Sequence, residues 1–125
     1  MNSPAVVVIE DSPTQAQQIA AHLTTFGVKV HIAYDGPEGL QLVDQVMPDA
    51  VVLDINLPSM SGFQVCRRIK RDENLAHIPV IMLTSADESD DILQGLDMGA
   101  TDYIPKDVYA TDNLVATLEA IGIIA

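Results

Sequence analysis

The stretch AVVLDINLPSMSG, residues 50–62, holds an apolar run that ends on an aspartate. Ala50 to Leu53 has the composition of a buried strand, and Asp54 follows at once. An ionised carboxylate is costly to bury unless a cation or hydrogen-bond donors compensate its charge. Asp54 therefore needs a partner from elsewhere in the chain.

Short apolar runs alternate with amphipathic segments on both sides of this stretch. Ser12 and Ser61 are placed as N-caps, and Gly27 and Gly99 stand just past helix ends. The pattern predicts strands over residues 5–9, 28–34, 50–53, 79–83 and 102–104, and helices over 12–27, 37–46, 61–71, 89–98 and 109–121.

This fivefold strand–helix alternation predicts an α/β fold with a parallel sheet covered by helices on both faces. The runs at 5–9, 50–53 and 79–83 are nearly all apolar, as expected for strands buried on both faces. A common doubly wound order for five strands is 2-1-3-4-5, and we expect that order here.

Length and composition set limits on function. The chain has 125 residues, which predicts one domain over 1–125, and its net charge is −12. That charge argues against binding of nucleic acid or an anionic membrane by this domain. The longest apolar runs are too short to span a bilayer, and the single cysteine, Cys66, rules out an internal disulfide. We expect a cytoplasmic protein.

Polar side chains follow four of the predicted strands. Glu10 and Asp11 end the first strand, Asp54 the third and Thr84 the fourth, while the fifth leads to Lys106. In the order 2-1-3-4-5 the first and third strands are neighbours, and ligands bind at the carboxyl ends of such strands. Three carboxylates would then converge beside a hydroxyl and an ammonium.

Three clustered acids raise each other's pKa values unless a cation is present. Mg²⁺ suits such a site, because it accepts one or two carboxylates, waters and a phosphate oxygen. Asp54 would then be compensated by the metal and by Lys106. The alternative is that these acids only cap the following helices, where acids are common.

The motifs VIEDS, VVLDINLPSMSG, IPVIMLTSA and GATDYIPK occur in this order over the whole chain. With them the sequence resembles the receiver domain of two-component response regulators, the CheY-like family. The resemblance implies that Asp54 is the phosphoacceptor and that Thr84 and Lys106 assist it, with Thr84 and Tyr103 as switch residues. It implies Mg²⁺ ligation by Asp11, Asp54, the backbone carbonyl of Asn56 and, through water, Glu10.

The implied function is a signalling switch in a phosphorelay. The domain would take a phosphoryl group from a phosphohistidine of a histidine kinase or histidine phosphotransfer protein and signal to a protein partner. It would catalyse only its own phosphorylation and dephosphorylation, so we do not expect a metabolic enzyme. With no output segment after residue 125, a stand-alone receiver is expected.

Two other functions compete with this interpretation. One is an Mg²⁺-dependent hydrolase of the haloacid dehalogenase type, which also forms an aspartyl phosphate. That family has an acid two residues after the nucleophile, whereas this chain has Asn56, and the chain has no room for a cap domain. The other is a receiver-like scaffold that takes no phosphate, against which the set of Asp54, Thr84 and Lys106 speaks.

The residue after the predicted site lysine departs from the family pattern. The family usually has proline there, joined by a cis bond, whereas here Asp107 follows Lys106 and Pro105 precedes it. A cis bond without proline costs roughly 3–4 kcal/mol, so we predict a trans Lys106–Asp107 bond. The lysine stem is flexible enough for its ammonium still to reach Asp54.

The C-terminal third of the chain is strongly acidic. Residues 87–112 hold eight acids and one base, Lys106, and residues 87–125 contain no arginine. The family often uses the helix 89–98, the strand 102–104 and the helix 109–121 as an output face. Two such faces would repel each other here, so we expect no symmetric dimer and a downstream partner with a basic face.

Overall fold

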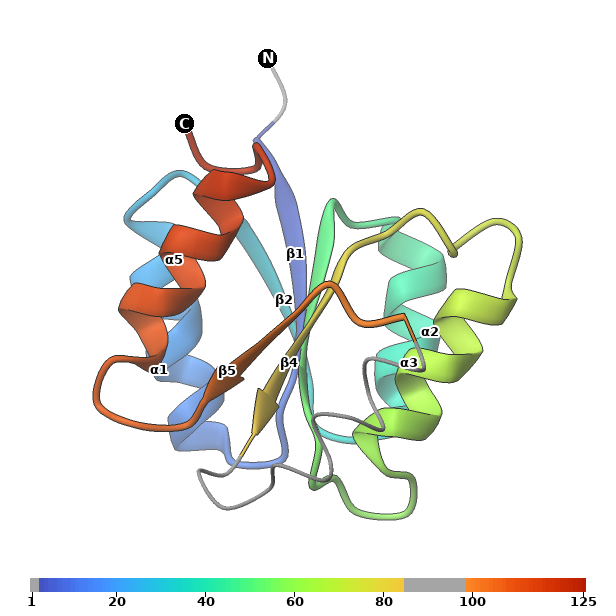
Figure 1. Cartoon of the computed structure of the whole chain (residues 1–125). Coiled ribbons are helices and arrows are strands. Elements are labelled where there is room, and N and C mark those ends of the chain that lie inside the picture. The colour runs from blue at the N-terminus through green and yellow to red at the C-terminus, as the bar shows by residue number, and fades with distance from the viewer. Residues whose placement is uncertain (1–2, 85–98) are drawn as a thin grey trace.

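A computed structural model describes residues 3–84 and 99–125 of the chain. The described parts hold five parallel strands and the helices that connect to them (Figure 1). The strands are β1 (Ala5–Ile9), β2 (Lys29–Ala33), β3 (Ala50–Asp54), β4 (Val80–Thr84) and β5 (Asp102–Pro105). The described helices are α1 (Pro13–Thr24), α2 (Gly36–Val46), α3 (Gly62–Arg71) and α5 (Ala110–Ala120), which follow β1, β2, β3 and β5.

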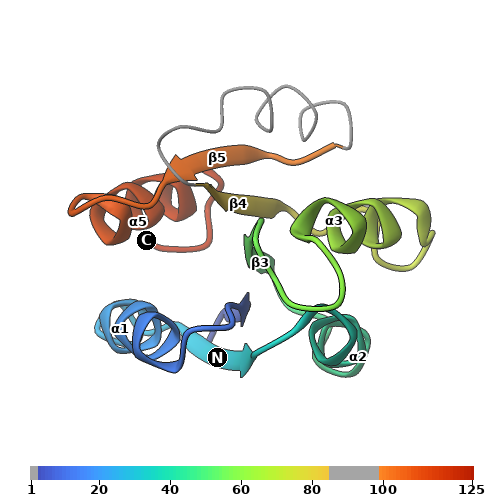
Figure 2. The same cartoon turned by 90° about the horizontal axis from the view of Figure 1, so that it is seen from below.

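The strands form one sheet in the order β2-β1-β3-β4-β5 with every pair parallel, which confirms the predicted fold class and strand order. Helices α1 and α5 cover one face of the sheet, and α2 and α3 cover the other (Figures 1 and 2). The winding direction reverses between β1 and β3, so the carboxyl ends of these two strands border the expected ligand site.

Alternate residues of the buried strands supply two separate cores. Val6 and Val8 of β1 pack with Leu23 and Leu118 on the side of α1 and α5. Val7 and Ile9 point the other way and pack with residues of α2 and α3. Because both faces are covered, the side chains of β1, β3 and β4 are almost all buried, which explains their continuous apolar sequences.

Helix ends follow the capping residues of the sequence. The Ser12 hydroxyl accepts from the Gln15 N–H at 3.3 Å, and Ser61 forms a reciprocal capping box with Gln64, so both predicted caps are confirmed. Asp35, which the sequence reasoning did not single out, caps α2 by accepting from the Glu38 N–H at 2.8 Å. Most element bounds differ from the predicted ones by one to three residues at an end.

The predicted helix over residues 89–98 lies outside the described residues. Within the described parts of the chain, none of the helices is long and apolar enough to cross a membrane.

Candidate functional site

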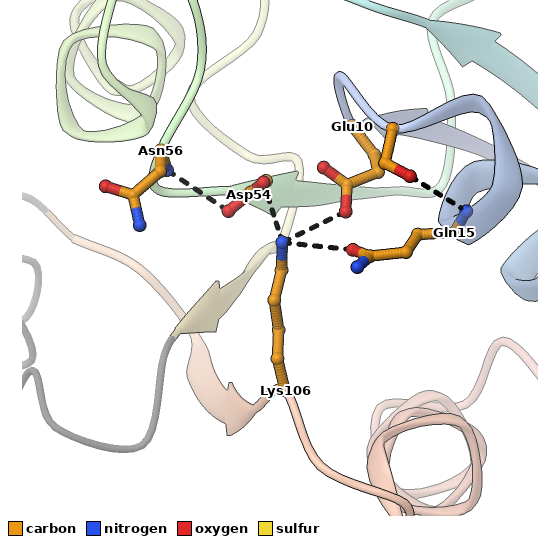
Figure 3. Close-up of polar contacts among 6 residues, drawn as sticks. Glu10, Gln15, Asp54, Asn56 and Lys106 are labelled. Carbon is orange, nitrogen blue, oxygen red and sulfur yellow. Dashed lines mark hydrogen bonds and ion pairs between the residues drawn. The ribbon is translucent and has the colours of Figure 1, made fainter.

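Three strand ends bring a lysine against two buried acids. The Lys106 ammonium, carried just after β5, lies 2.7 Å from Asp54 Oδ2 at the end of β3 and 3.0 Å from Glu10 Oε1 just after β1 (Figure 3). These are the only contacts of lysine or arginine with acids within ion-pair distance among the described residues. Lys106 is thus the compensating cation that Asp54 requires.

Asp54 is held from two sides. Its side chain is 3% exposed, so it needs strong partners. Oδ2 accepts from Lys106, and Oδ1 accepts from the backbone N–H of Asn56 at 3.1 Å (Figure 3). The carboxylate is therefore fixed in one orientation at the end of a rigid strand, and Asn56 is exposed beside it.

Glu10 is fully buried beside Asp54. The pKa of Glu10 is raised from 4.5 to about 7: burial is the largest cause, hydrogen bonding and charge of Asp54 also raise it, and Lys106 opposes the rise. Its Oε2 atom is buried and has no hydrogen-bond partner among the described residues. The single positive charge of Lys106 thus compensates the negative charges of the two carboxylates only in part.

The pKa of Lys106 is also raised, but for a lysine this shift favours the charged form. Partial burial alone would lower the pKa of Lys106, but hydrogen bonds to Asp54 and Glu10 and the charges of these two acids outweigh burial and raise it. The ammonium therefore stays charged at neutral pH.

Three acids lie close enough together that they could hold a metal ion. Glu10, Asp11 and Asp54 each offer a carboxylate oxygen, and these oxygens lie within 4.8 Å of one another. Asp11 is exposed, so an ion could approach from solvent. The bare Glu10 Oε2 and the excess of acids over ammonium both fit a hard divalent cation with oxygen ligands.

Thr84 and Tyr103 share one face of the sheet. Met82 pairs with Tyr103 in the register of β4 and β5, and Thr84 pairs with Pro105, so Thr84 and Tyr103 stand two residue positions apart on the side of α3. Thr84 is buried, and the half-buried Tyr103 packs against the core cluster on that face. The structure therefore places both residues on one side, without a direct register pair.

The Lys106–Asp107 bond is trans, as predicted, since no cis peptide bond occurs among the described residues. The backbone N–H of Lys106 donates to the Thr84 carbonyl at 2.6 Å, which ties the loop to the end of β4. The ammonium reaches Asp54 from this path, which confirms the second part of that prediction.

Sequence reasoning missed one member of this group. The side chain of Gln15, in the first turn of α1, accepts a third hydrogen bond from Lys106, at 3.3 Å between Nζ and Oε1 (Figure 3). Its position three residues after the Ser12 cap was the only local signal, and nothing in the sequence points to a partner 91 residues away.

Comparisons with known proteins place the chain in a family. A family model for the response regulator receiver domain matches residues 6–119. The DNA-binding dual master transcriptional regulator RpaA of Synechocystis is 38% identical over 118 residues, which cover 94% of this chain and 48% of that protein. Protein PilH of Pseudomonas aeruginosa is 35% identical over 116 residues, covering 93% of this chain and 95% of that protein.

The fold has matches of the same kind among solved structures. The chemotaxis response regulator CheY4 of Vibrio cholerae superposes with a TM-score of 0.88 at 26% identity, covering 96% of this chain and 99% of that one. The chain spans half or less of the length of RpaA and of several other curated relatives, but nearly the whole of PilH. The match over residues 6–119 and the agreement in fold show that this chain belongs to the response regulator receiver domains of two-component signalling systems.

Proposed function

We propose that this domain is a phosphoacceptor switch in which Asp54 takes a phosphoryl group from a phosphohistidine of a histidine kinase or histidine phosphotransfer protein. The observation that carries the proposal is the buried Asp54 carboxylate, oriented at a strand end by Lys106 and by the Asn56 N–H, with two further acids beside it. Receiver domains are signalling modules, and the family match supports this class of function.

In the proposed reaction an Asp54 oxygen attacks the phosphorus of the donor. A P–O bond to Asp54 forms, the P–N bond to the donor histidine breaks, and the departing imidazole nitrogen keeps the electron pair and takes a proton from solvent. Lys106 neutralises charge on the transferred oxygens, because its ammonium already contacts Asp54. Thr84, at the end of β4, supplies a hydroxyl for one of those oxygens after a small movement.

We assign Mg²⁺ to the acidic cluster. Asp11, Asp54 and the backbone carbonyl of Asn56 would hold it, with Glu10 acting through water. When bound, the ion offsets negative charge on the acids and on the phosphoryl group. The exposed position of Asp11 and the bare Oε2 of Glu10 support this assignment.

Incubation with acetyl phosphate and Mg²⁺ tests the function directly. We expect mass spectrometry of the intact protein to show one added phosphoryl group that depends on Mg²⁺. Turnover of p-nitrophenyl phosphate is the matching assay for the haloacid-dehalogenase-type hydrolase, which the family match does not support. Absence of labelling would favour a receiver-like scaffold that takes no phosphate. Multiple turnovers of p-nitrophenyl phosphate would favour the hydrolase.

Stability should couple to pH through Glu10 in the metal-free domain. The raised pKa of Glu10 means that its carboxyl group binds a proton more tightly in the folded state than in the unfolded state. This contribution is complete below about pH 4.5 and is lost as the pH rises through about 7. Because Mg²⁺ would replace the proton as the compensating charge, we predict a larger Mg²⁺-induced rise in Tm at pH 8 than at pH 5.5.

The measurement is thermal unfolding at both pH values with MgCl₂ or with EDTA. Glu10→Gln is the control, because it removes the titrating group and should reduce the difference between the two pH values. Equal Mg²⁺ effects at pH 5.5 and pH 8 in the parent protein would contradict the prediction.

Thr84 and Tyr103 are proposed to transmit the phosphorylation state. Movement of Thr84 toward a phosphoryl oxygen would open space on the face of the sheet that Tyr103 also occupies, and Tyr103 could fill it. We predict that Thr84→Ala is still phosphorylated but transmits little of the change to residues 86–112. Amide hydrogen exchange with and without acetyl phosphate measures this response.

Thr101→Ala is the matched control for that experiment, since Thr101 is exposed and lies at the opposite end of β5. It should keep the full exchange response. An unaltered response in Thr84→Ala would remove Thr84 from the proposed switch.

The acidic C-terminal third supports a separate, basic downstream partner. Residues 87–112 carry eight acids against Lys106, whose ammonium is engaged at the site. We predict that the beryllofluoride-activated domain stays monomeric in light scattering at low salt, because two such faces repel each other. A dimer that forms on activation through α5 and survives at low salt would contradict this prediction.

The bounds of the domain, its location in the cell and its binding of nucleic acid can be proposed from the same observations. We propose that residues 1–125 form a single receiver domain acting in the cytoplasm and without binding nucleic acid itself. The match over residues 6–119 supports a single receiver domain, and the net charge of −12 supports the absence of nucleic-acid binding by it.

A further inference from the structure

Among the residues that the structure describes, the Lys106 ammonium has three acceptors, and one of them is uncharged. Asp54 Oδ2 lies at 2.7 Å, Glu10 Oε1 at 3.0 Å and Gln15 Oε1 at 3.3 Å from Nζ (Figure 3). An ammonium group has three N–H donors, so each acceptor takes one of them. Gln15 is the only one of the three that stands outside the acidic cluster.

The first turn of α1 places the Gln15 amide. The Gln15 N–H donates to the Ser12 hydroxyl, and the Ala16 N–H donates to the Ser12 carbonyl at 2.9 Å, which fixes the backbone from which the side chain extends. Gln15 and Lys106 both line a cavity between α1 and the segment that follows β5, together with Gln18, Ile19 and Val108. The amide therefore reaches the ammonium from the solvent side of the site.

The acids and the amide differ in what happens to them during the reaction. Glu10 and Asp54 would turn their oxygens toward a cation, and Asp54 would gain a phosphoryl group, so their bonds to Lys106 change as the site fills. Gln15 carries no charge and is not among the proposed metal ligands. It can keep its bond to the ammonium through these changes, which matters because the lysine stem is long and flexible.

We propose that Gln15 is a positioning residue that holds the Lys106 ammonium over Asp54 during phosphoryl transfer. The inference rests on the proposed function. It assigns Gln15 a role that acts through Lys106 rather than through contact with the metal or the phosphoryl group.

Gln15→Met is the informative substitution, because methionine has a similar length and no strong acceptor. Gln15 is exposed and folding should be unaffected, which circular dichroism and Tm can verify. We expect phosphorylation by acetyl phosphate to slow about fivefold, as for loss of a weak hydrogen bond to a charged group, with Mg²⁺ affinity unchanged. Gln18→Met is the matched control, since it lines the same cavity on the same helix.

A double-mutant cycle with Lys106→Met separates positioning from a direct role. Two quantities are measured for each variant: the phosphorylation rate, and the stabilisation by Mg²⁺ with beryllofluoride, which requires no turnover. If Gln15 acts through Lys106, Gln15→Met lowers both in the parent and neither in the Lys106→Met protein.

The outcomes distinguish this inference from the proposed function. A parent protein that takes no phosphoryl group would refute the function itself. A phosphorylated parent with an unchanged Gln15→Met variant, or equal losses with and without Lys106, would overturn only the role of Gln15.

Discussion

Asp54→Asn is expected to reduce phosphoryl labelling by acetyl phosphate to background, a loss of at least about 100-fold. An amide oxygen is a far weaker nucleophile than a carboxylate, and it carries no charge for a cation or for Lys106 to offset. The readout is the intact mass after incubation with acetyl phosphate and Mg²⁺.

The variant should remain folded, so that loss of labelling reports on chemistry. Removing one acid relieves repulsion with Glu10, while Lys106 keeps Glu10 and Gln15 as acceptors. Asp44→Asn is the matched control, because Asp44 is an exposed acid on α2 away from the cluster, and it should label as the parent does. Equal labelling of Asp54→Asn and the parent would refute the assignment of the phosphoacceptor.

Gly62→Ala is expected to cost about 3 kcal/mol of unfolding free energy, at the upper end of the usual cost of overpacking. A Cβ at Gly62 would overlap the backbone carbonyl of Asp54 and would lie 2.8 Å from Ile55 Cα. Both obstacles are backbone atoms, which cannot swing aside as a side chain can. The loop from β3 to α3 would have to open, although the Gly62 N–H donates to the Ile55 carbonyl at 2.8 Å.

The same change should disturb the site, because the loop carries Asp54 and the Asn56 N–H that orients it. Urea unfolding and the labelling rate would measure the two effects. Gly27→Ala is the comparison: a Cβ there meets no atom within 4 Å, so only its positive φ of 80° adds a cost, about 1–2 kcal/mol. A Gly62→Ala protein as stable as the parent would show that the loop tolerates a side chain.

Local patterns were sufficient to predict the described strands and helices and their order along the chain. Burial on both faces of a parallel sheet leaves a continuous apolar run in the sequence, and a helix start leaves a capping residue, as at Ser12 and Ser61. The placement of Asp54 at a strand end could also be predicted, because the apolar run that marks the strand stops at the residue before it. These features depend on interactions over a few residues.

The electrostatic state of the site was decided only by the tertiary structure. Lys106 contacts Glu10, Gln15 and Asp54, which are separated from it in the sequence by 96, 91 and 52 positions. No local pattern encodes contacts over such separations. The complete burial of Glu10, the largest cause of its pKa of about 7, depends on the packing of segments that are distant in the sequence. The amino-acid sequence by itself determined which charged side chains gather at the carboxyl edge of the sheet, whereas packing of distant segments added Gln15 as a contact of Lys106 and raised the pKa values of Glu10 and Lys106.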